Sequence, residues 1–196
     1  MLTLMWLTPA QDRLFTGPAS DRRKFLDRFS LVHAPSHGLS SIRYEKARSE
    51  RNRLLSDGIT DRGWYDALEA DMAMQGAPIA QARAITATRL TEEIETRAAA
   101  KDDDVFPKAI VTLEGEAEEQ FQGGQSFDDV ENFIREALAA DRPLDQRAGR
   151  TLRGVHKSDL KVRHAEKNMP AQDFEDTHER HKDRKAFKRL KVKICP

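Results

Sequence analysis

Three successive cations, Arg22, Arg23 and Lys24, are the residues of this chain whose types and spacing most suggest chemistry, and they follow the turn signal Gly17-Pro18. They fall in the first turns of a predicted helix, where positive charge opposes the helix dipole. An anion or a carboxylate is therefore expected nearby, such as DNA phosphate, nucleotide phosphate or an acidic partner. The alternative is a structural set of salt bridges, because arginines often pair with carboxylates inside proteins.

Metal chemistry has weak support in the sequence. The chain has six histidines: His33, His37, His156, His164, His178 and His181. The first two and the last two have a spacing that a helix could use, but neither pair has the nearby carboxylate or thiol pattern typical of zinc, so we predict surface histidines and no metal site. The single cysteine, Cys195, excludes an internal disulfide and a Cys-rich zinc site and favours a reducing, cytoplasmic location.

No catalytic residue is predicted. The sequence contains no GxxxxGK[ST], GxGxxG, HExxH or GxSxG motif. Its 33 Lys and Arg balance 33 Asp and Glu, so the whole-chain charge gives no field for binding nucleic acid. Residues 174–196 are an exception, with eight basic against four acidic residues and no early apolar period, and we predict a solvated or disordered tail there.

The first predicted elements position the three cations. The apolar run at residues 1–7 is too short for a signal peptide or a membrane span and is typical of a buried strand. Ser20 is the predicted N-cap of the helix that carries the cations. A second helix is predicted over about 39–55 and a third from about 61, with a kink at Pro78.

The third helix defines the predicted architecture of the middle of the chain. Its apolar residues recur at helical spacing, which predicts one narrow buried stripe made of Trp64, Leu68, Met72, Ile79, Leu90 and Ile94. Two polar helices joined by the turn Asp57-Gly58 and facing each other through narrow stripes indicate an antiparallel helical hairpin, a short coiled-coil-like arm.

Beyond the hairpin, residues 107–113 are rich in β-branched residues and predict a strand. Ser126, followed three residues later by Asp129, predicts a capped helix that stops before Pro143. Residues 151–162 are interpreted as a strand-turn-strand element around Gly154, with His156, Lys157 and Asp159 in the turn region.

Three separated stretches resemble the RecF family. The run Trp6-Leu7-Thr8-Pro9-Ala10-Gln11-Asp12, then Gly17-Pro18, then Arg22-Arg23-Lys24-Phe25-Leu26-Asp27 is similar to the signature segment of that family. Leu152-Arg153-Gly154-Val155-His156-Lys157-Ser158-Asp159-Leu160 resembles the Gly-Pro-His-basic-x-Asp-Leu segment, with Val155 at the proline position. Tyr44-Glu45-Lys46-Ala47 and Arg51-Asn52-Arg53-Leu54-Leu55 resemble the helix that climbs the family's arm.

The resemblance implies an α+β fold, a partial ABC/SMC-like ATPase head with an inserted antiparallel helical, coiled-coil-like arm. The expected parts are a head fragment with a Q-loop-like segment at 1–32, the hairpin arm at 33–103, a return segment of arm and head at 104–173, and the basic tail at 174–196.

The resemblance also implies a function in DNA replication, recombinational repair and the SOS response. Intact family members bind ATP with magnesium and single-stranded or gapped DNA, form a self-dimer and work with RecO and RecR. By position, Gln11 would lie in the loop that senses magnesium and the γ-phosphate, and His156, Lys157 and Asp159 near the nucleotide or the dimer interface. No membrane association is expected.

The sequence also departs from the family pattern. The family's phosphate loop would precede Met1, and its Ser-x-Gly-Glu-Gln signature and second acidic ATPase motif should follow Asp173, where the chain instead reads Phe174-Glu175-Asp176-Thr177-His178. We therefore expect an internal, truncated fragment that binds no cofactor and hydrolyses no ATP by itself. The alternative function is a helical-hairpin interaction module without DNA or ATP binding, which would use the Trp64 to Ile94 face.

Overall fold

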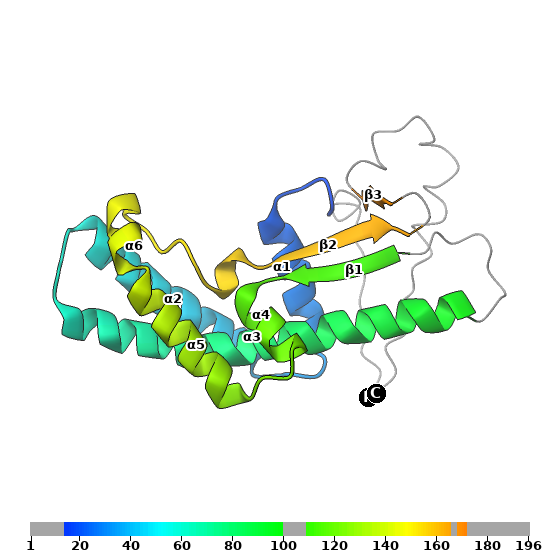
Figure 1. The fold of residues 1–196 in the computed structure, drawn as a ribbon, viewed down its shortest axis with the longest axis horizontal. Coiled ribbons are helices and arrows are strands. Elements are labelled where there is room, and N and C mark those ends of the chain that lie inside the picture. The colour runs from blue at the N-terminus through cyan, green and yellow to red at the C-terminus, as the bar shows by residue number, and fades with distance from the viewer. Residues whose placement is uncertain (1–13, 100–108, 166–167, 172–196) are drawn as a thin grey trace.

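The structure is a computed structural model that describes residues 14–99, 109–165 and 168–171 (Figure 1). Along the chain the elements are α1 (Ala19–Ser30), α2 (His37–Ser56), α3 (Arg62–Ala99), β1 (Ala109–Glu114), α4 (Glu116–Gln122), α5 (Phe127–Ala140), α6 (Arg142–Ala148), the 3-10 turn η2 (Val155–Lys157), β2 (Asp159–His164) and β3 (Met169–Pro170). The predicted strand at 1–7, Gln11 and the tail at 174–196 lie outside the described residues.

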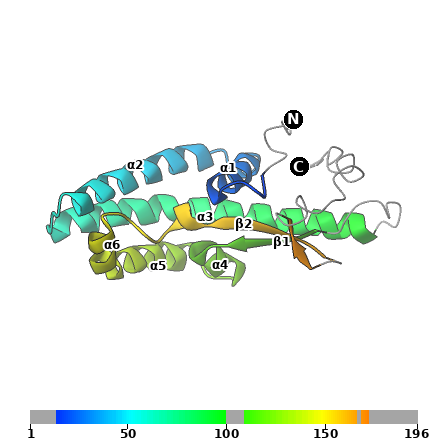
Figure 2. The same cartoon turned by 90° about the horizontal axis from the view of Figure 1, so that it is seen from above.

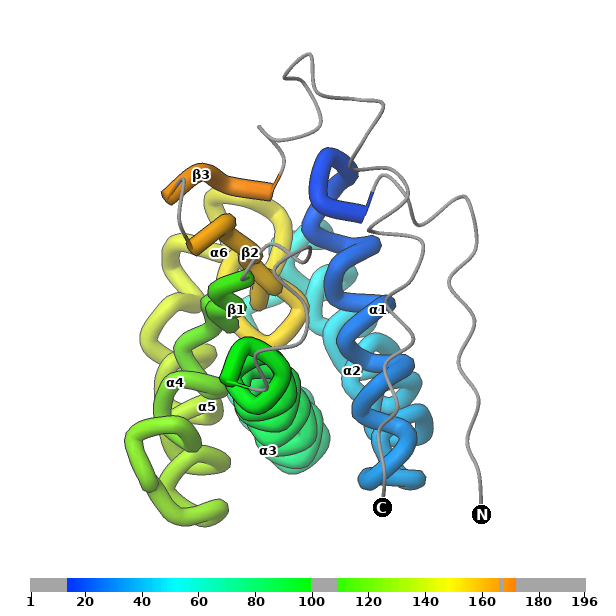
Figure 3. The backbone as a smooth tube through the Cα atoms, turned by 90° about the vertical axis from the view of Figure 1, so that its right-hand side faces the viewer, coloured from blue at the N-terminus to red at the C-terminus, as the bar shows by residue number. Residues whose placement is uncertain are grey.

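Helix α3 is the central element, with α1 and α2 on one side of it and α4 and α5 on the other (Figures 2 and 3). Its middle is therefore buried on several sides, because four helices and β1 contact it. Small residues allow this: a Cβ at Gly76 would meet Ile134 and Tyr44, and six of the 14 buried residues of α3 are alanines.

The prediction of one narrow apolar stripe on this helix is wrong at its first position. The side chain of Trp64 is 60% exposed, whereas the adjacent Tyr65 is 2% exposed and packs with Leu54 and Leu55 of α2. Met72 and Ile79 are buried as predicted. The sequence period missed the width of the buried surface because alanine and glycine positions carry little hydrophobic signal.

The three strands form one antiparallel sheet in the order β1-β2-β3, in which Leu113 of β1 is paired with Leu160 of β2. Both leucines are buried against Leu26 of α1 and Ala87 of α3. The strand predicted at 107–113 is confirmed over 109–113, and it continues to Glu114. The strand-turn-strand prediction for 151–162 is wrong in its first half, because residues 151–154 are irregular and η2 precedes the only strand of that stretch.

Local capping signals were informative in one helix and misleading in another. Ser126 caps α5, and its Oγ accepts a hydrogen bond from the Asp129 amide at 3.2 Å. Ser20 lies inside α1, and the N-cap is Pro18. The short helices α4 and α6 were not predicted. Pro143, before which the preceding helix was predicted to stop, lies in the first turn of α6.

Among the residues that the structure describes, no helix combines the length and apolar character needed to cross a bilayer.

Candidate functional site

The two sequence segments with the most functional promise meet where α1 packs on the start of β2. Arg22 donates two hydrogen bonds to the carboxylate of Asp159, at 2.7 Å and 2.9 Å, and both side chains are largely buried. The same guanidinium donates to the carbonyl of Gly17 at 2.6 Å and to that of Phe15 at 3.3 Å. The anion expected near the three cations is therefore, for Arg22, a carboxylate of this chain.

Electrostatics agree with that pairing. The hydrogen bond to Asp159 raises the pKa of Arg22, against a smaller opposing effect of burial. Burial alone would raise the pKa of Asp159, but hydrogen bonds from Arg22 and Lys161 lower it. Both groups therefore stay charged at neutral pH.

The other two cations have different surroundings. Arg23 is half-buried, and its Nη1 donates to the carbonyl of Ser158 at 2.8 Å. Burial lowers the pKa of Arg23, and the nearby charge of Arg83 lowers it further, whereas Asp159 and Asp27 act in the opposite direction. Lys24 is exposed, with Asp21 as its ion-pair partner at 3.4 Å.

The turn η2 is held by a neutral histidine. The Tyr44 hydroxyl lies 3.1 Å from Nδ1 of His156, and Nε2 lies 3.3 Å from the carbonyl of Thr151. Burial, followed by the charge of Arg48, lowers the pKa of His156 to about 3. A neutral ring that donates from Nε2 to the carbonyl has an accepting Nδ1, so the tyrosine donates.

Gly154 lets Tyr44 come this close. Its φ is +131°, a conformation that L side chains rarely adopt, and a Cβ there would collide with the Tyr44 hydroxyl. His156 is therefore a fixed structural group of the loop, and it has no mobile proton for acid–base chemistry at neutral pH.

A buried polar chain extends from this loop into the helices. Ser158 donates to Glu118 at 2.5 Å, and Arg83 bridges Glu118 and the carbonyl of Val155. Arg83 also donates to Asp27 of α1 at 2.7 Å. Burial opposes ionisation of Asp27, but hydrogen bonds from His37 and Arg83 outweigh it and lower the pKa of Asp27 to about 2.

His37 corrects a sequence prediction. It was predicted as a surface histidine, but it is 3% exposed, and its Nε2 lies 2.9 Å from Asp27. The helical spacing of His33 and His37 reflects two separate structural contacts, since His33 bonds to Thr86. In the described part of the chain, no group of three or more His, Cys, Asp or Glu side chains could hold a metal ion.

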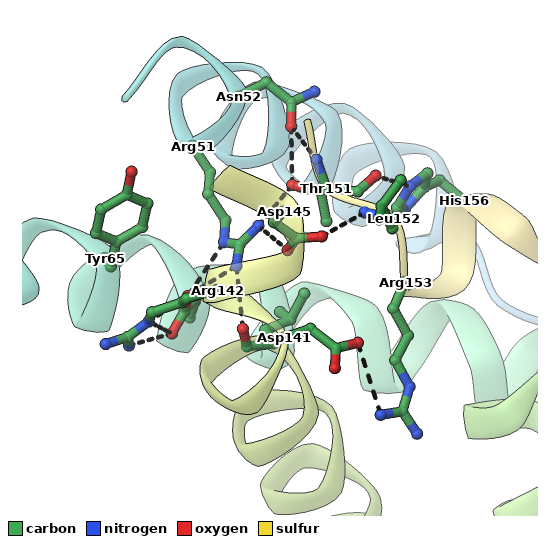
Figure 4. A network of polar contacts seen from close by, with 12 residues as sticks. Arg51, Asn52, Tyr65, Asp141, Arg142, Asp145, Thr151, Leu152, Arg153 and His156 are labelled. Atoms are coloured by element: carbon green, nitrogen blue, oxygen red, sulfur yellow. Dashed lines mark hydrogen bonds and ion pairs between the residues drawn. The ribbon is translucent and has the colours of Figure 1, made fainter. Parts of the chain in front are cut away.

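The segment before Gly154 is fixed by a second network, centred on Arg51 (Figure 4). The fully buried Arg51 donates to Glu69 at 3.0 Å, to Asp145 at 2.6 Å and to Thr151 at 2.8 Å. Asp145 in turn accepts from the amide of Leu152 at 2.9 Å.

Two more side chains complete this Arg51 network. Asn52 accepts from the Thr151 amide at 2.7 Å, and Arg142 donates to Glu69 at 2.8 Å. Sequence reasoning did not predict the network. Arg51 was quoted only within a family-like stretch, and nothing in the spacing pointed to its partners, which lie 18 and 94 positions away.

Comparisons with known proteins fit this geometry, although no protein-family model matches the chain. The chain is 48% identical over 171 residues to the DNA replication and repair protein RecF of Mesorhizobium japonicum, which covers 87% of this chain and 44% of that protein. It is 46% identical over 168 residues to RecF of Brucella abortus, covering 86% and 43%. This stretch of the chain is homologous to RecF.

Solved RecF structures have the same fold over this region. The recombination mediator protein RecF of the RecFOR pathway, as RecF-ATPrS, superposes with a TM-score of 0.69 at 20% identity, covering 82% of this chain and 43% of that one. The structure of RecF-ATP gives a TM-score of 0.67, covering 80% and 41%. The chain thus spans less than half the length of the RecF proteins that it matches.

The RecF resemblance predicted from the sequence motifs is confirmed. Two of those motifs are spatial neighbours, since the Arg22 to Asp27 segment contacts the 152–160 segment through Asp159 and Ser158. Lys24 and Lys157 are exposed, and Lys24 pairs with Asp21. Gln11, predicted for the nucleotide-sensing loop, lies outside the described residues.

Proposed function

We propose that this chain is part of a RecF-like DNA replication and repair protein. In intact form such a protein binds single-stranded or gapped DNA and ATP for recombinational repair and the SOS response in the cytoplasm. The main support is the 48% identity to a RecF protein over 171 residues. The contact between the two RecF-like segments through Arg22 and Asp159 adds to it, because it joins segments 137 positions apart into one site.

The proposed parts follow the order of the chain. Residues 1–32 and 104–173 contribute to an ATPase head, and residues 33–103 form an inserted helical arm. The antiparallel packing of α2 on α3 supports the arm, although α3 also contacts α4, α5 and β1 and is not a free-standing hairpin. Gln11, His156, Lys157 and Asp159 are the proposed nucleotide-associated residues, among which His156 and Asp159 act by holding the loop in place.

ATP and magnesium are the proposed cofactors of the intact protein, and we propose that this chain alone hydrolyses no ATP. The test is release of inorganic phosphate from ATP with Mg²⁺ and a gapped duplex, with the full-length Mesorhizobium japonicum RecF as positive control. Turnover by the chain alone that matches this control would refute the proposal.

Arg23 and Lys24 are the proposed DNA contacts, and Arg22 supports them by fixing α1 to β2. Binding of a fluorescent gapped duplex should weaken steeply between 50 and 200 mM salt, because phosphate contacts release counterions. The double variant Arg23→Gln, Lys24→Gln should bind more weakly, whereas Arg97→Gln, at an exposed ion pair near the end of α3, should bind like the wild type. Equal binding by all three proteins would contradict this role. RecO, RecR and a second RecF-like chain are the proposed partners.

One observation favours the alternative function, a helical-hairpin interaction module. Trp64 is 60% exposed at the α2–α3 end and lines an apolar groove of about 310 Å³ with Leu54, Leu68 and Arg53. Tryptophan and arginine often dominate protein interfaces. In a Trp6→Phe background, a salt-insensitive change of Trp64 fluorescence on adding RecR or RecO would favour this function, and no change would count against it.

A further inference from the structure

The charges of this chain are separated between its two sides. Residues 114–141 contain nine Asp and Glu against one Arg, whereas residues 19–56 contain nine Lys and Arg against four Asp and Glu. The first stretch includes α4 and α5, and the second includes α1 and α2, which lie on the other side of α3 (Figures 2 and 3). The neutral chain thus has an acidic side and a basic side.

The acidic side contains an open cavity of about 290 Å³ between α5, the start of α4 and the loop before β2. Apolar side chains form much of its wall, among them Phe133, Ile134, Ala137, Leu138 and Leu152. Its charged lining residues are Glu114, Glu116, Glu119, Arg153 and Lys157. This acidic cavity therefore combines an apolar wall with more carboxylates than cations.

Most carboxylates of the acidic side are not neutralised. In the described part of the chain, four of the nine form ion pairs, with Lys161, Arg153 or Arg83 as the cation. The five that form none are Glu119, Asp128, Asp129, Glu131 and Glu136, and all of them except the half-buried Glu131 are exposed. Such a surface repels DNA phosphate and attracts a cationic protein surface.

The basic side has an exposed ridge on α2. Its members lie three and four positions apart, on the helix face opposite the buried Tyr44, and are Leu39, Ile42, Arg43 and Lys46. Leu39 is 52% exposed, and Ile42, at 70%, is the most exposed large hydrophobic residue that the structure describes. Arg43 and Lys46 are exposed and form no ion pair with a described residue. This α2 ridge therefore has two apolar side chains next to two unpaired cations.

We propose that the acidic cavity binds the α2 ridge of a second copy of this chain. Leu39 and Ile42 cover the apolar wall, and Arg43 and Lys46 face the carboxylates around it, so apolar surface meets apolar surface and each charge meets its opposite. The ridge of the same molecule is separated from its own cavity by α3 (Figure 3). The contact needs neither DNA nor ATP, so it does not rest on the proposed function.

The two surfaces of this contact are different, which makes it a head-to-tail contact. Each molecule in a dimer keeps one free cavity or one free ridge, so association continues beyond the dimer as the protein concentration rises. Added salt screens the exposed charges and weakens the contact. Sedimentation velocity of the whole chain at about 50 mM and about 500 mM salt measures both effects.

Two variants each remove one surface. Ile42→Asp places a carboxylate against the acidic cavity, and Glu119→Lys places a cation against the ridge, so each should weaken association by about tenfold or more. The matched controls are Ile59→Asp, at a 40% exposed residue of the α2–α3 turn, and Glu95→Lys, at an exposed residue near the end of α3. Both controls should associate like the wild type.

Mixing the two variants tests the head-to-tail geometry. Ile42→Asp keeps an intact cavity and Glu119→Lys keeps an intact ridge, so the mixture should form dimers and no longer species, although each variant alone is monomeric. Glu119 also accepts a hydrogen bond from the Gly115 amide at 3.3 Å. Glu119→Gln keeps an oxygen for that bond while removing the charge, so it separates lost association from a lost fold.

The basic residues 174–196 are the other candidate for the cavity. Lys188→Gln together with Arg189→Gln neutralises two cations of that stretch and leaves the α2 ridge intact. Association like that of the wild type supports the ridge. Association that is lost in this double variant but kept in Ile42→Asp assigns the cavity to residues 174–196 and overturns the proposal. A wild type that stays monomeric at low salt, or a mixture without dimers, also overturns it.

Discussion

Two arginines of this chain, Arg51 and Arg23, have opposite surroundings. Arg51 is completely buried and faces two buried carboxylates, Glu69 and Asp145, as well as the hydroxyl of Thr151. Arg23 is half-buried, bonds only to a backbone carbonyl among the described residues, and has a pKa that burial lowers. The two arginines therefore have different roles, although both lie in RecF-like stretches of sequence.

The difference shows what a charge needs when water is removed. A buried guanidinium is tolerated only if its partners replace its hydration, and Arg51 has such partners on α3, α5 and α6. A charge that remains partly hydrated needs no such set and stays available to a ligand. The set of partners that replaces the hydration of the guanidinium thus distinguishes a structural arginine from a ligand-binding one more reliably than the residue type does.

The largest effect is expected from Arg51→Leu. The substitution leaves the carboxylates of Glu69 and Asp145 buried without a cation, which should destabilise the fold by about 3–5 kcal/mol. Urea unfolding followed by circular dichroism measures the change. The control is Arg53→Leu, an exposed residue two positions later, which should change stability by no more than about 0.5 kcal/mol. Equal stability of the two variants would remove the distinction between the groups.

The next largest effect is a pH dependence caused by His156. Its folded pKa of about 3 lies below the ordinary value of 6.5, so the unfolded chain binds the proton more readily. Stability should therefore be fully present above pH 6.5 and fall as the pH drops towards 3, by about 1.4 kcal/mol per pH unit.

This slope can be assigned to one residue. Asp27, with a folded pKa of about 2, contributes stability that is lost only as the pH falls below its ordinary value of 3.8. Unfolding between pH 6 and pH 4.5 thus avoids Asp27, but burial and the charge of Arg89 also lower the pKa of His33, so the part due to His156 is the difference between the wild type and a His156 variant. The variant His156→Gln keeps a side-chain amide for hydrogen bonding and should have a shallower slope there; an unchanged slope would show that His156 is not held neutral.

A smaller effect is expected for the pair that joins the two RecF-like segments. Arg22→Gln, Asp159→Asn and the double variant form a cycle whose coupling free energy should be about 0.5–3 kcal/mol, because the side chains are largely buried and in direct contact. Chemical denaturation of the four proteins gives this value. Additive effects of the two substitutions would mean that the contact contributes nothing to the stability of the site.

Much of the secondary structure could be predicted from the sequence. The helices at 39–55 and from 61 and the strand at 107–113 were predicted within a few residues, because turn signals and apolar periods bounded them. The helices α4 and α6 are too short to repeat a helical period and were missed. Trp64 was wrongly assigned to the core because its spacing fits the stripe as well as that of Tyr65, and only the packing of α2 decides between them.

The candidate site was predictable only in its residue types. The sequence pointed to Arg22 and Arg23 and to the 156–159 segment, but it assigned the two segments to separate roles. It could not show that Asp159 is the partner of Arg22, because a contact across 137 positions leaves no periodic signal. The same limit applies to Arg51 and to His37, whose burial depends on helices distant in sequence.

The smallest expected effect is that of Lys157→Gln, and it tests whether an exposed cation differs in role from the buried Arg51. Neutralising Lys157 with glutamine should change the free energy of unfolding by no more than about 0.5 kcal/mol, since the side chain is exposed and forms no ion pair among the described residues. Thermal and urea unfolding in 50 and 500 mM salt measure this change. If Lys157→Gln instead destabilised the chain by more than 1 kcal/mol at both salt concentrations, Lys157 would be a structural residue like Arg51. Unchanged stability together with weaker nucleotide binding is the combination expected only of a cation that is retained for a ligand.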